Sequence, residues 1–135
     1  KEAEDGEPLL PGHVYIAPGD RQMTVLKQGI GMQIRCRPGE KVNGHCPSVD
    51  VLFHSAARFA DQNTMGIILT GMGQDGAQGL LAMRKRGAFT VGQDEQSCAV
   101  YGMPAAAFRA GAVVKQGPPE KIAEEILEYF SRDKK

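Results

Sequence analysis

Met65-Gly-Ile-Ile-Leu69, Thr70-Gly-Met-Gly-Gln-Asp-Gly76 and the segment from Ala77 to Arg86 together decide the fold of this chain. The first is a short apolar run typical of a buried strand, and the third is typical of a helix. The three glycines between them permit a sharp turn and positive φ angles. Chemistry in an open α/β sheet is usually placed at the carboxyl ends of strands, so Asp75 at this junction is the first candidate site residue.

Helices and strands alternate from residue 48 onward. Ser48 is a good N-cap for a helix over 48–62, because its hydroxyl can accept a hydrogen bond from a free N–H of the first turn. The later patterns predict strands at 65–70, 88–92 and 112–115, and helices at 77–86, 104–110 and 119–131. This order predicts an α/β fold with a doubly wound, mostly parallel sheet and helices on both faces. The last helix carries an apolar face formed by Ile122, Ala123, Ile126, Leu127 and Phe130.

The first 47 residues have the pattern of β structure. The apolar run 13–18 predicts a short strand that ends at the turn Pro18-Gly19-Asp20. Segments 22–27 and 32–37 flank a glycine-rich turn and predict a small N-terminal β-hairpin. Residues 38–47 are expected to form a polar loop.

The composition fits one domain and excludes several function classes. The chain has 135 residues, 41% of them hydrophobic, and its 16 basic and 16 acidic residues give a formal net charge of zero. A neutral chain has no general attraction to nucleic acid, so no nucleic-acid partner is expected. No apolar run approaches the ~20 residues of a membrane helix, so no membrane insertion is expected.

The cysteines favour a reducing, cytoplasmic environment. They are Cys36, Cys46 and Cys98, an odd number without a C-x-x-C pair. Together with His45 they could be imagined as zinc ligands, but the adjacent His45 and Cys46 would struggle to converge on one ion. Reduced thiols are the simpler interpretation, and no metal site is expected.

Asp75 itself admits three interpretations. The first is structural, since aspartate is a favoured N-cap and Asp75 directly precedes the helix 77–86. The second is a dinucleotide site, because Gly71-x-Gly73-x-x-Gly76 fits G-x-G-x-x-G, with Asp94 and Glu95 at the distance expected of a ribose-binding acid. Against it, Asp75 would place a carboxylate among the N–H groups needed for pyrophosphate, at a cost of about 4 kcal/mol for like charges ~4 Å apart.

The third interpretation is catalytic. A carboxylate at this edge can orient a histidine that serves as general base, and glycine N–H groups can face a developing oxyanion. This chain does not complete such a triad in an evident way. Its histidines, His13, His45 and His54, are not predicted to lie near Asp75, and none of its serines lies in a G-x-S-x-G elbow.

Six segments together resemble the catalytic domain of the bacterial chemotaxis protein-glutamate methylesterase (CheB) family. They are Lys1-Glu-Ala-Glu-Asp-Gly-Glu7, Pro11-Gly-His-Val-Tyr-Ile-Ala-Pro18, Pro47-Ser-Val-Asp-Val-Leu-Phe53, Leu69-Thr-Gly-Met-Gly-Gln-Asp-Gly76, Gln93-Asp-Glu-Gln-Ser-Cys98 and Tyr101-Gly-Met-Pro104. Each motif is moderately specific, but their order and spacing resemble the family's from the first residue to the last helix.

This resemblance implies a serine esterase with a Ser-His-Asp triad on an α/β fold. Such enzymes hydrolyse γ-glutamyl methyl esters on the cytoplasmic helices of chemoreceptors, release methanol, and often deamidate receptor glutamines. They need no metal or organic cofactor. Asp75 matches the triad aspartate, and Gly71, Met72, Gly73 and Gly76 belong to the same active-site loop. Gly102, Met103 and Pro104 resemble a segment expected near the same edge.

The chain also departs from the family pattern. The family's serine and histidine lie upstream of the segment that resembles residue 1, and a phosphorylatable receiver domain normally precedes the catalytic domain. We therefore expect residues 1–135 to be the C-terminal part of a methylesterase catalytic domain, inactive alone and prone to self-association through an exposed sheet edge. A dinucleotide-binding module and a non-catalytic interaction module remain the alternatives.

Overall fold

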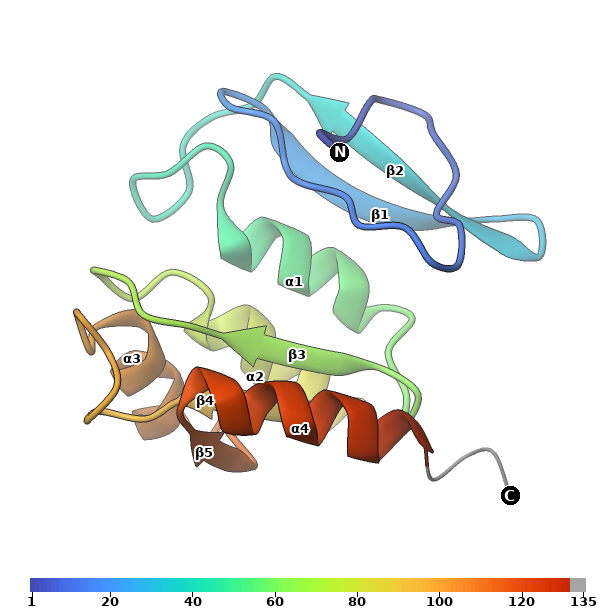
Figure 1. Cartoon of the computed structure of the whole chain (residues 1–135). Helices are drawn as coiled ribbons and strands as arrows, with labels where there is room; N and C mark the ends of the chain where they lie inside the picture. Colours follow the sequence, from blue (N-terminus) through green and yellow to red (C-terminus); the bar gives the residue numbers. More distant parts are fainter. Residues whose placement is uncertain (132–135) are drawn as a thin grey trace.

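A hairpin packs on α1, which separates it from a small parallel sheet, and the computed structural model describes residues 1–131 (Figure 1). The hairpin pairs β1 (Gln22–Gln28) with β2 (Gly31–Arg37) in antiparallel register, with Val25 opposite Ile34. Gly29, at φ 62°, provides the positive φ angle that the tight turn between them requires. The hairpin predicted from the sequence is confirmed.

The predicted strand 13–18 is wrong. This segment forms only a single parallel bridge, between Glu2 and Ile16. Val14 and Ile16 keep 73% and 60% of their surface exposed, so no layer formed by residues 1–131 covers them. An apolar run becomes a strand only when a partner strand is available for its backbone N–H and C=O groups.

Helices and strands alternate along the rest of the chain, as predicted. The elements are α1 (Val49–Ala57), β3 (Met65–Ile68), α2 (Ala77–Lys85), β4 (Phe89–Gln93), α3 (Met103–Arg109), β5 (Lys115–Gly117) and α4 (Pro119–Ser131). The strands form a parallel sheet in the order β3-β4-β5. In Figure 1, α4 lies on the near face of this sheet and α2 on the far face, while α1 lies between the sheet and the hairpin.

Three predicted boundaries are wrong by two residues or more. The strand predicted at 65–70 ends at Ile68. The first helix ends at Ala57 rather than at residue 62, where the N–H groups of Phe59 and Ala60 donate three residues back, to the carbonyls of Ala56 and Ala57. The last strand covers 115–117 instead of 112–115, since Ala112 and Val113 are buried in the core after α3. The last helix, 119–131, has the predicted bounds.

The core lies between α1, α2, α3 and the sheet. Its most buried side chains include Leu80, Ala107 and Ala112, with Ala57, Ile68, Ala77, Met83, Ala88 and Val113 around them. Met23, Ile34 and Cys36 form a second cluster with Ala3 beneath the hairpin. Both clusters consist of the small and medium apolar residues that close helix–helix and helix–sheet packing requires.

Only part of the predicted apolar face of α4 packs. Ile122 is buried, and the ring of Tyr129 stacks on that of Phe89 with centroids 4.7 Å apart. Ala123, Leu127 and Phe130, which were predicted to be on the buried face, are exposed, Leu127 by 72%. The sheet contacts one side of the helix, and nothing in residues 1–131 covers the other.

No helix within 1–131 has the length and apolar character needed to cross a bilayer.

Candidate active site at the carboxyl edge of the sheet

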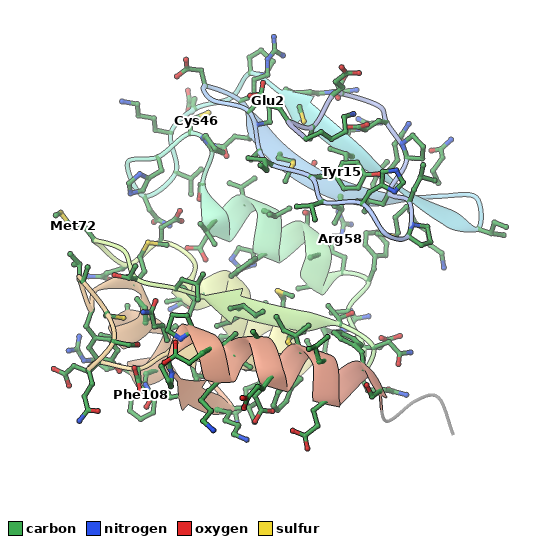
Figure 2. The ribbon with its side chains drawn as sticks, viewed as in Figure 1. Glu2, Tyr15, Cys46, Arg58, Met72 and Phe108 are labelled. Carbon is green, nitrogen blue, oxygen red and sulfur yellow. The ribbon has the colours of Figure 1, made fainter. Side chains whose placement is uncertain are left out.

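The loop after β3 is shaped by its glycines for different reasons. Gly73 and Gly76 have φ angles of 94° and 97°, which disfavour a side chain. At Gly71 the constraint is steric instead. A Cβ atom there would lie 2.5 Å from the Sδ atom of Met103, so the Met103 side chain would have to shift. Met72 lies at the tip of this loop with 77% of its surface exposed (Figure 2).

Asp75 turns away from the helix that follows it. The N-cap of α2 is Gly76, and Asp75 accepts no hydrogen bond from that helix, so the interpretation that Asp75 caps 77–86 is wrong. The carboxylate of Asp75 is 2% exposed and points at the start of α1. There it accepts hydrogen bonds from the N–H groups of Val49 at 2.6 Å and Asp50 at 3.2 Å.

Two side chains complete the set of donors to Asp75. The hydroxyl of Ser48, which also caps α1 as predicted, donates at 2.8 Å, and the amide of Asn43 donates at 2.9 Å. Burial raises the pKa of Asp75, and the hydrogen bonds from Asn43, Ser48 and the two N–H groups outweigh it, so its pKa lies below the ordinary value. Asp75 is therefore ionised at neutral pH.

A second buried carboxylate makes the reverse contact. Asp50, in the first turn of α1, accepts a hydrogen bond at 2.7 Å from the N–H of Gly79 in the first turn of α2. The amino ends of the two helices are thus capped by acids that belong to each other's segments, an arrangement we call the reciprocal caps. Negative charge is favourable at both ends, because each helix dipole is positive there.

The reciprocal caps bear on the dinucleotide alternative. A pyrophosphate would have to bind the free N–H groups at the start of α2. The predicted obstacle there was Asp75, but the carboxylate that occupies this end is that of Asp50. The objection to a dinucleotide therefore stands, with a different acid as its cause.

Asn43 is a site residue that the sequence analysis missed. It lies in the turn Val42-Asn43-Gly44-His45, where Val42 and His45 exchange both backbone hydrogen bonds, at 2.9 and 3.0 Å. Asn43 and Gly44 have φ angles of 54° and 82°, the positive pair of a two-residue hairpin turn. The Asn-Gly pair was the available signal for this turn, inside a segment predicted only as a polar loop.

A second segment, 100–104, lies against the glycine loop as expected. The N–H of Gly71 donates to the carbonyl of Val100 at 3.1 Å, and the carbonyl of Gly71 accepts from Gly102 and Met103 at 3.2 and 2.8 Å. A Cβ atom on Gly102 would lie 2.7 Å from that carbonyl oxygen, so only glycine fits. Pro104 is buried in the first turn of α3, one position later than predicted.

These two segments border one cavity of about 410 Å³. Its lining residues are Gly73, Gln74, Ala77, Tyr101, Gly102, Ala106 and Arg109. The exposed histidines His13, His45 and His54 do not line it, and no histidine donates to Asp75 within residues 1–131. The structure thus gathers the predicted glycines, the buried acid and the 102–104 segment at one edge of the sheet.

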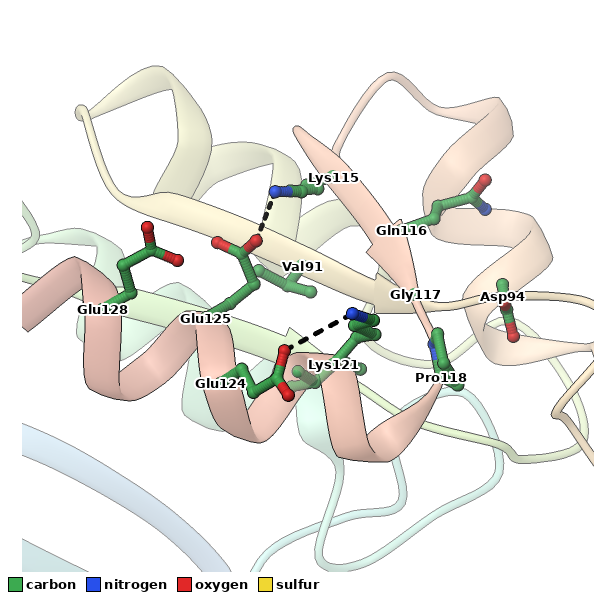
Figure 3. A pocket seen from close by; sticks show the side chains of 11 residues that line it. Val91, Asp94, Lys115, Gln116, Gly117, Pro118, Lys121, Glu124, Glu125 and Glu128 are labelled. Atoms are coloured by element: carbon green, nitrogen blue, oxygen red, sulfur yellow. Dashed lines mark hydrogen bonds and ion pairs between the residues drawn. The ribbon is translucent and has the colours of Figure 1, made fainter.

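Another cavity, also of about 410 Å³, lies between β5 and α4 (Figure 3). Its two lysines each contact an acid, since Lys115 pairs with Glu125 and Lys121 lies 3.6 Å from Glu124, while Asp94 and Glu128 add two further acids to the lining. Asp94, which the dinucleotide alternative assigned to a ribose, borders this cavity and accepts hydrogen bonds from Ser97. Four acids against two lysines make this lining unfavourable for an anionic ligand such as a dinucleotide.

The fold and the site define an α/β domain that holds a buried, ionised acid at the carboxyl edge of a parallel sheet. Comparison with known proteins narrows this class: the model of the CheB methylesterase family matches residues 1–126. The chain therefore belongs to the CheB methylesterase family.

Individual relatives agree with this assignment. A Syntrophomonas wolfei protein-glutamate methylesterase/protein-glutamine glutaminase is 53% identical over 132 residues, covering 98% of this chain and 39% of that protein. The Escherichia coli K12 enzyme of the same name is 53% identical over 131 residues, covering 97% and 38%. The crystal structure of the Thermotoga maritima CheB methylesterase catalytic domain superposes with a TM-score of 0.91 at 37% identity, covering 95% of this chain and 68% of that domain.

Proposed function

We propose that this chain supplies the acid of a Ser-His-Asp triad in a protein-glutamate methylesterase. The observation that carries the proposal is the state of Asp75: a buried, ionised carboxylate, fixed by four hydrogen bonds in a loop at the carboxyl edge of the sheet. A triad acid must have this character, because it holds the histidine in one tautomer and stabilises the imidazolium that forms.

The distribution of donors leaves that histidine an acceptor position on Oδ2. Asn43, Ser48 and the N–H of Asp50 all donate to Oδ1 of Asp75, whereas Oδ2 accepts only from the N–H of Val49 among the described residues. A carboxylate oxygen can accept two hydrogen bonds or more. The imidazole N–H would therefore bind Oδ2.

The serine and the histidine are proposed to lie in polypeptide upstream of residue 1. The chain spans about two fifths of the length of the curated relatives that it matches. Against the Thermotoga catalytic domain it covers 68% of the length. The order of the motifs that resemble the family supports the proposal that residues 1–135 are the C-terminal part of such a domain. A receiver domain in the complete protein is proposed on the same family grounds.

The reaction in the complete protein would be acyl transfer. The serine hydroxyl attacks the carbonyl carbon of a γ-glutamyl methyl ester while histidine accepts its proton, and methanol leaves with a proton returned by histidine. Water then attacks the acyl-enzyme by the same route and leaves a glutamate. The substrates would be methylated cytoplasmic helices of bacterial chemoreceptors, with glutamine deamidation as a related activity.

The other predicted residues would shape the site. Gly71, Gly73 and Gly76 set the loop that carries Asp75, and the exposed Met72 at its tip would contact the receptor helix. Gly102 and Met103 hold this loop from the other side, while the buried Pro104 lies in the first turn of α3. None of these roles requires a metal ion or an organic cofactor.

Methanol release by the complete protein tests this function. Incubated with a receptor cytoplasmic fragment that has been methylated with a radioactive methyl group, the complete protein should release volatile label, and residues 1–135 alone should not. Release by residues 1–135 alone would refute an upstream nucleophile. A rise in the melting temperature with millimolar NAD, together with no methanol release, would favour the dinucleotide alternative instead.

Residues 1–135 studied alone are expected to self-associate. β3 is an edge strand in the described sheet, and the apolar side chains of Leu69, Leu127 and Phe130 are exposed. Unpaired strand edges and exposed apolar faces favour association with another chain. Sedimentation velocity at micromolar concentration should show dimers or larger species, whereas the complete protein should not associate through this edge. A compact monomer with cooperative unfolding would contradict the expectation.

A further inference from the structure

We propose that Asn43 is a positioning residue for catalysis, whose amide fixes the carboxylate of Asp75 so that Oδ2 faces the catalytic imidazole. This inference rests on the proposed function, and it adds a residue from a loop 32 positions upstream of the acid. Asn43 itself would not touch the substrate or the reacting atoms.

The turn that carries Asn43 presents its side chain with little freedom. Its backbone is closed by the paired hydrogen bonds between Val42 and His45, and the positive φ of Asn43 is one that asparagine adopts readily. The side-chain nitrogen donates to Oδ1 of Asp75 at 2.9 Å and to Oδ2 of Asp50 at 2.7 Å. Both N–H bonds of the amide are therefore used.

The chemistry of the two partners fixes which way the amide points. Both are carboxylates, which accept hydrogen bonds and do not donate them when ionised, so the amide nitrogen and not its oxygen must lie between them. Asp50 is in turn anchored to α2 by the N–H of Gly79. A chain of bonds thus runs from Gly79 through Asp50 and Asn43 to Asp75.

This chain has a consequence for the basicity of Asp75. Each donor on its carboxylate stabilises the ionised form and spreads its negative charge. A less basic carboxylate attracts the proton of the imidazolium less strongly, so the histidine releases that proton at a lower pH. The titratable group that shares Asn43 with Asp75 is Asp50; the other donors, the hydroxyl of Ser48 and two backbone N–H groups, are neutral.

Asn43→Gly in the complete protein tests the role. Glycine keeps the positive φ angle and removes the amide, so the backbone is not strained. We expect kcat to fall about 10- to 100-fold, since hydrogen bonds to charged groups are worth this much, with KM changed less than about threefold. The acidic limb of the pH–rate profile should move up by about half a pKa unit to one unit, because the freed carboxylate becomes more basic.

Asn43→Asp provides the second variant. It keeps the size and turn preference of asparagine but puts a third carboxylate between Asp50 and Asp75. Its loss of kcat and the upward shift of the acidic limb of its pH–rate profile should therefore exceed those of Asn43→Gly. Should Asn43→Gly lose cooperative unfolding, Asn43→Asp decides the question by the same readouts. Asn63→Ala, an exposed asparagine at the opposite end of β3, is the control expected to leave the rate unchanged.

Two outcomes would overturn the proposal. One is an unchanged rate in both Asn43 variants. The other is a lower rate with no shift in the acidic limb of the pH–rate profile, since a merely structural role would lower kcat or stability without moving that limb. The parallel variant Asp75→Asn separates the two proposals: if it retains full activity, the function assigned to Asp75 fails and the role of Asn43 fails with it.

Stability against pH gives a readout that does not depend on activity. The pKa of Asp75 lies below its ordinary value in the folded chain, so this acid stabilises the fold above about pH 4 and loses that contribution as the pH falls through its folded pKa. Asn43→Gly should raise that pKa and shrink the loss of stability between neutral pH and about pH 2 relative to the unsubstituted protein. If the urea midpoint falls by the same amount across this pH range in Asn43→Gly and in the unsubstituted protein, the coupling is refuted, whatever the enzyme hydrolyses.

Discussion

Asp75→Asn in the complete protein should lower kcat by about 10³- to 10⁴-fold while the protein still folds. The amide cannot stabilise an imidazolium, and its nitrogen presents a donor where the histidine needs an acceptor. KM should change little, because the loss falls on the transition state. Methanol release from methylated receptor, followed at saturating substrate, measures the effect.

The structure adds a cost in stability to this substitution. Oδ1 of Asp75 accepts three hydrogen bonds and could be retained by the amide oxygen, but the amide nitrogen would then face the N–H of Val49, which is 2.6 Å from Oδ2. Two donors facing each other cost about 1–3 kcal/mol, so the melting temperature should fall. Asp61→Asn is the matched control, because Asp61 is an exposed acid before β3, at the opposite end of the strand. Equal rates for the two variants would remove Asp75 from the mechanism.

Gly79→Ala should destabilise the fold by about 2–4 kcal/mol, through overpacking and the loss of a buried hydrogen bond. In an exposed helix the same change stabilises by ~1 kcal/mol, so the sign of the effect is the test. A Cβ atom on Gly79 would lie 2.5 Å from Cβ of Phe53 and 3.1 Å from Oδ1 of Asp50. Helices α1 and α2 would have to separate, which also breaks the bond between Gly79 and Asp50.

Urea denaturation of the complete protein measures this loss, with Gly19→Ala as the control. Gly19 has no atom within 4 Å of its added Cβ and no positive φ angle, so its substitution should change the free energy of unfolding by less than ~0.5 kcal/mol. Because the separation of α1 from α2 also moves Asp75, Gly79→Ala should lower kcat as well. A stabilised Gly79→Ala protein would show that the two helices do not pack as described.

The alternation of helices and strands could be predicted because each element has a recognisable local sequence pattern. The helix 119–131 has a proline at its start and an apolar period of 3.6, and the structure reproduces both of its ends. The loop from Gly71 to Gly76 was identified for a similar reason, since its glycines lie between an apolar run and a helical pattern. These signals need no knowledge of what lies elsewhere in the fold.

The predictions that were wrong concern features that depend on contacts with residues distant in the sequence. The run 13–18 has the composition of a strand, but the described part of the chain offers it only one bridge. Leu127 belongs to an apolar face that the same residues leave uncovered. Asp75 has the position of an N-cap for α2, yet its donors come from residues 25 to 32 positions upstream. A capping preference indicates that an acid will bind free N–H groups at the start of a helix. Which helix supplies those N–H groups is determined only by the packing of α1 against α2.

The reciprocal caps also affect how descendants of such a protein would evolve. Asp75 closes one helix end and is bound by another loop, so a lineage that had lost its nucleophile would still be under selection to keep this acid for folding. Retention of the aspartate in a related sequence is therefore weak evidence of surviving catalysis. Under the proposed function, the presence of the serine and the histidine is the better marker of a working enzyme.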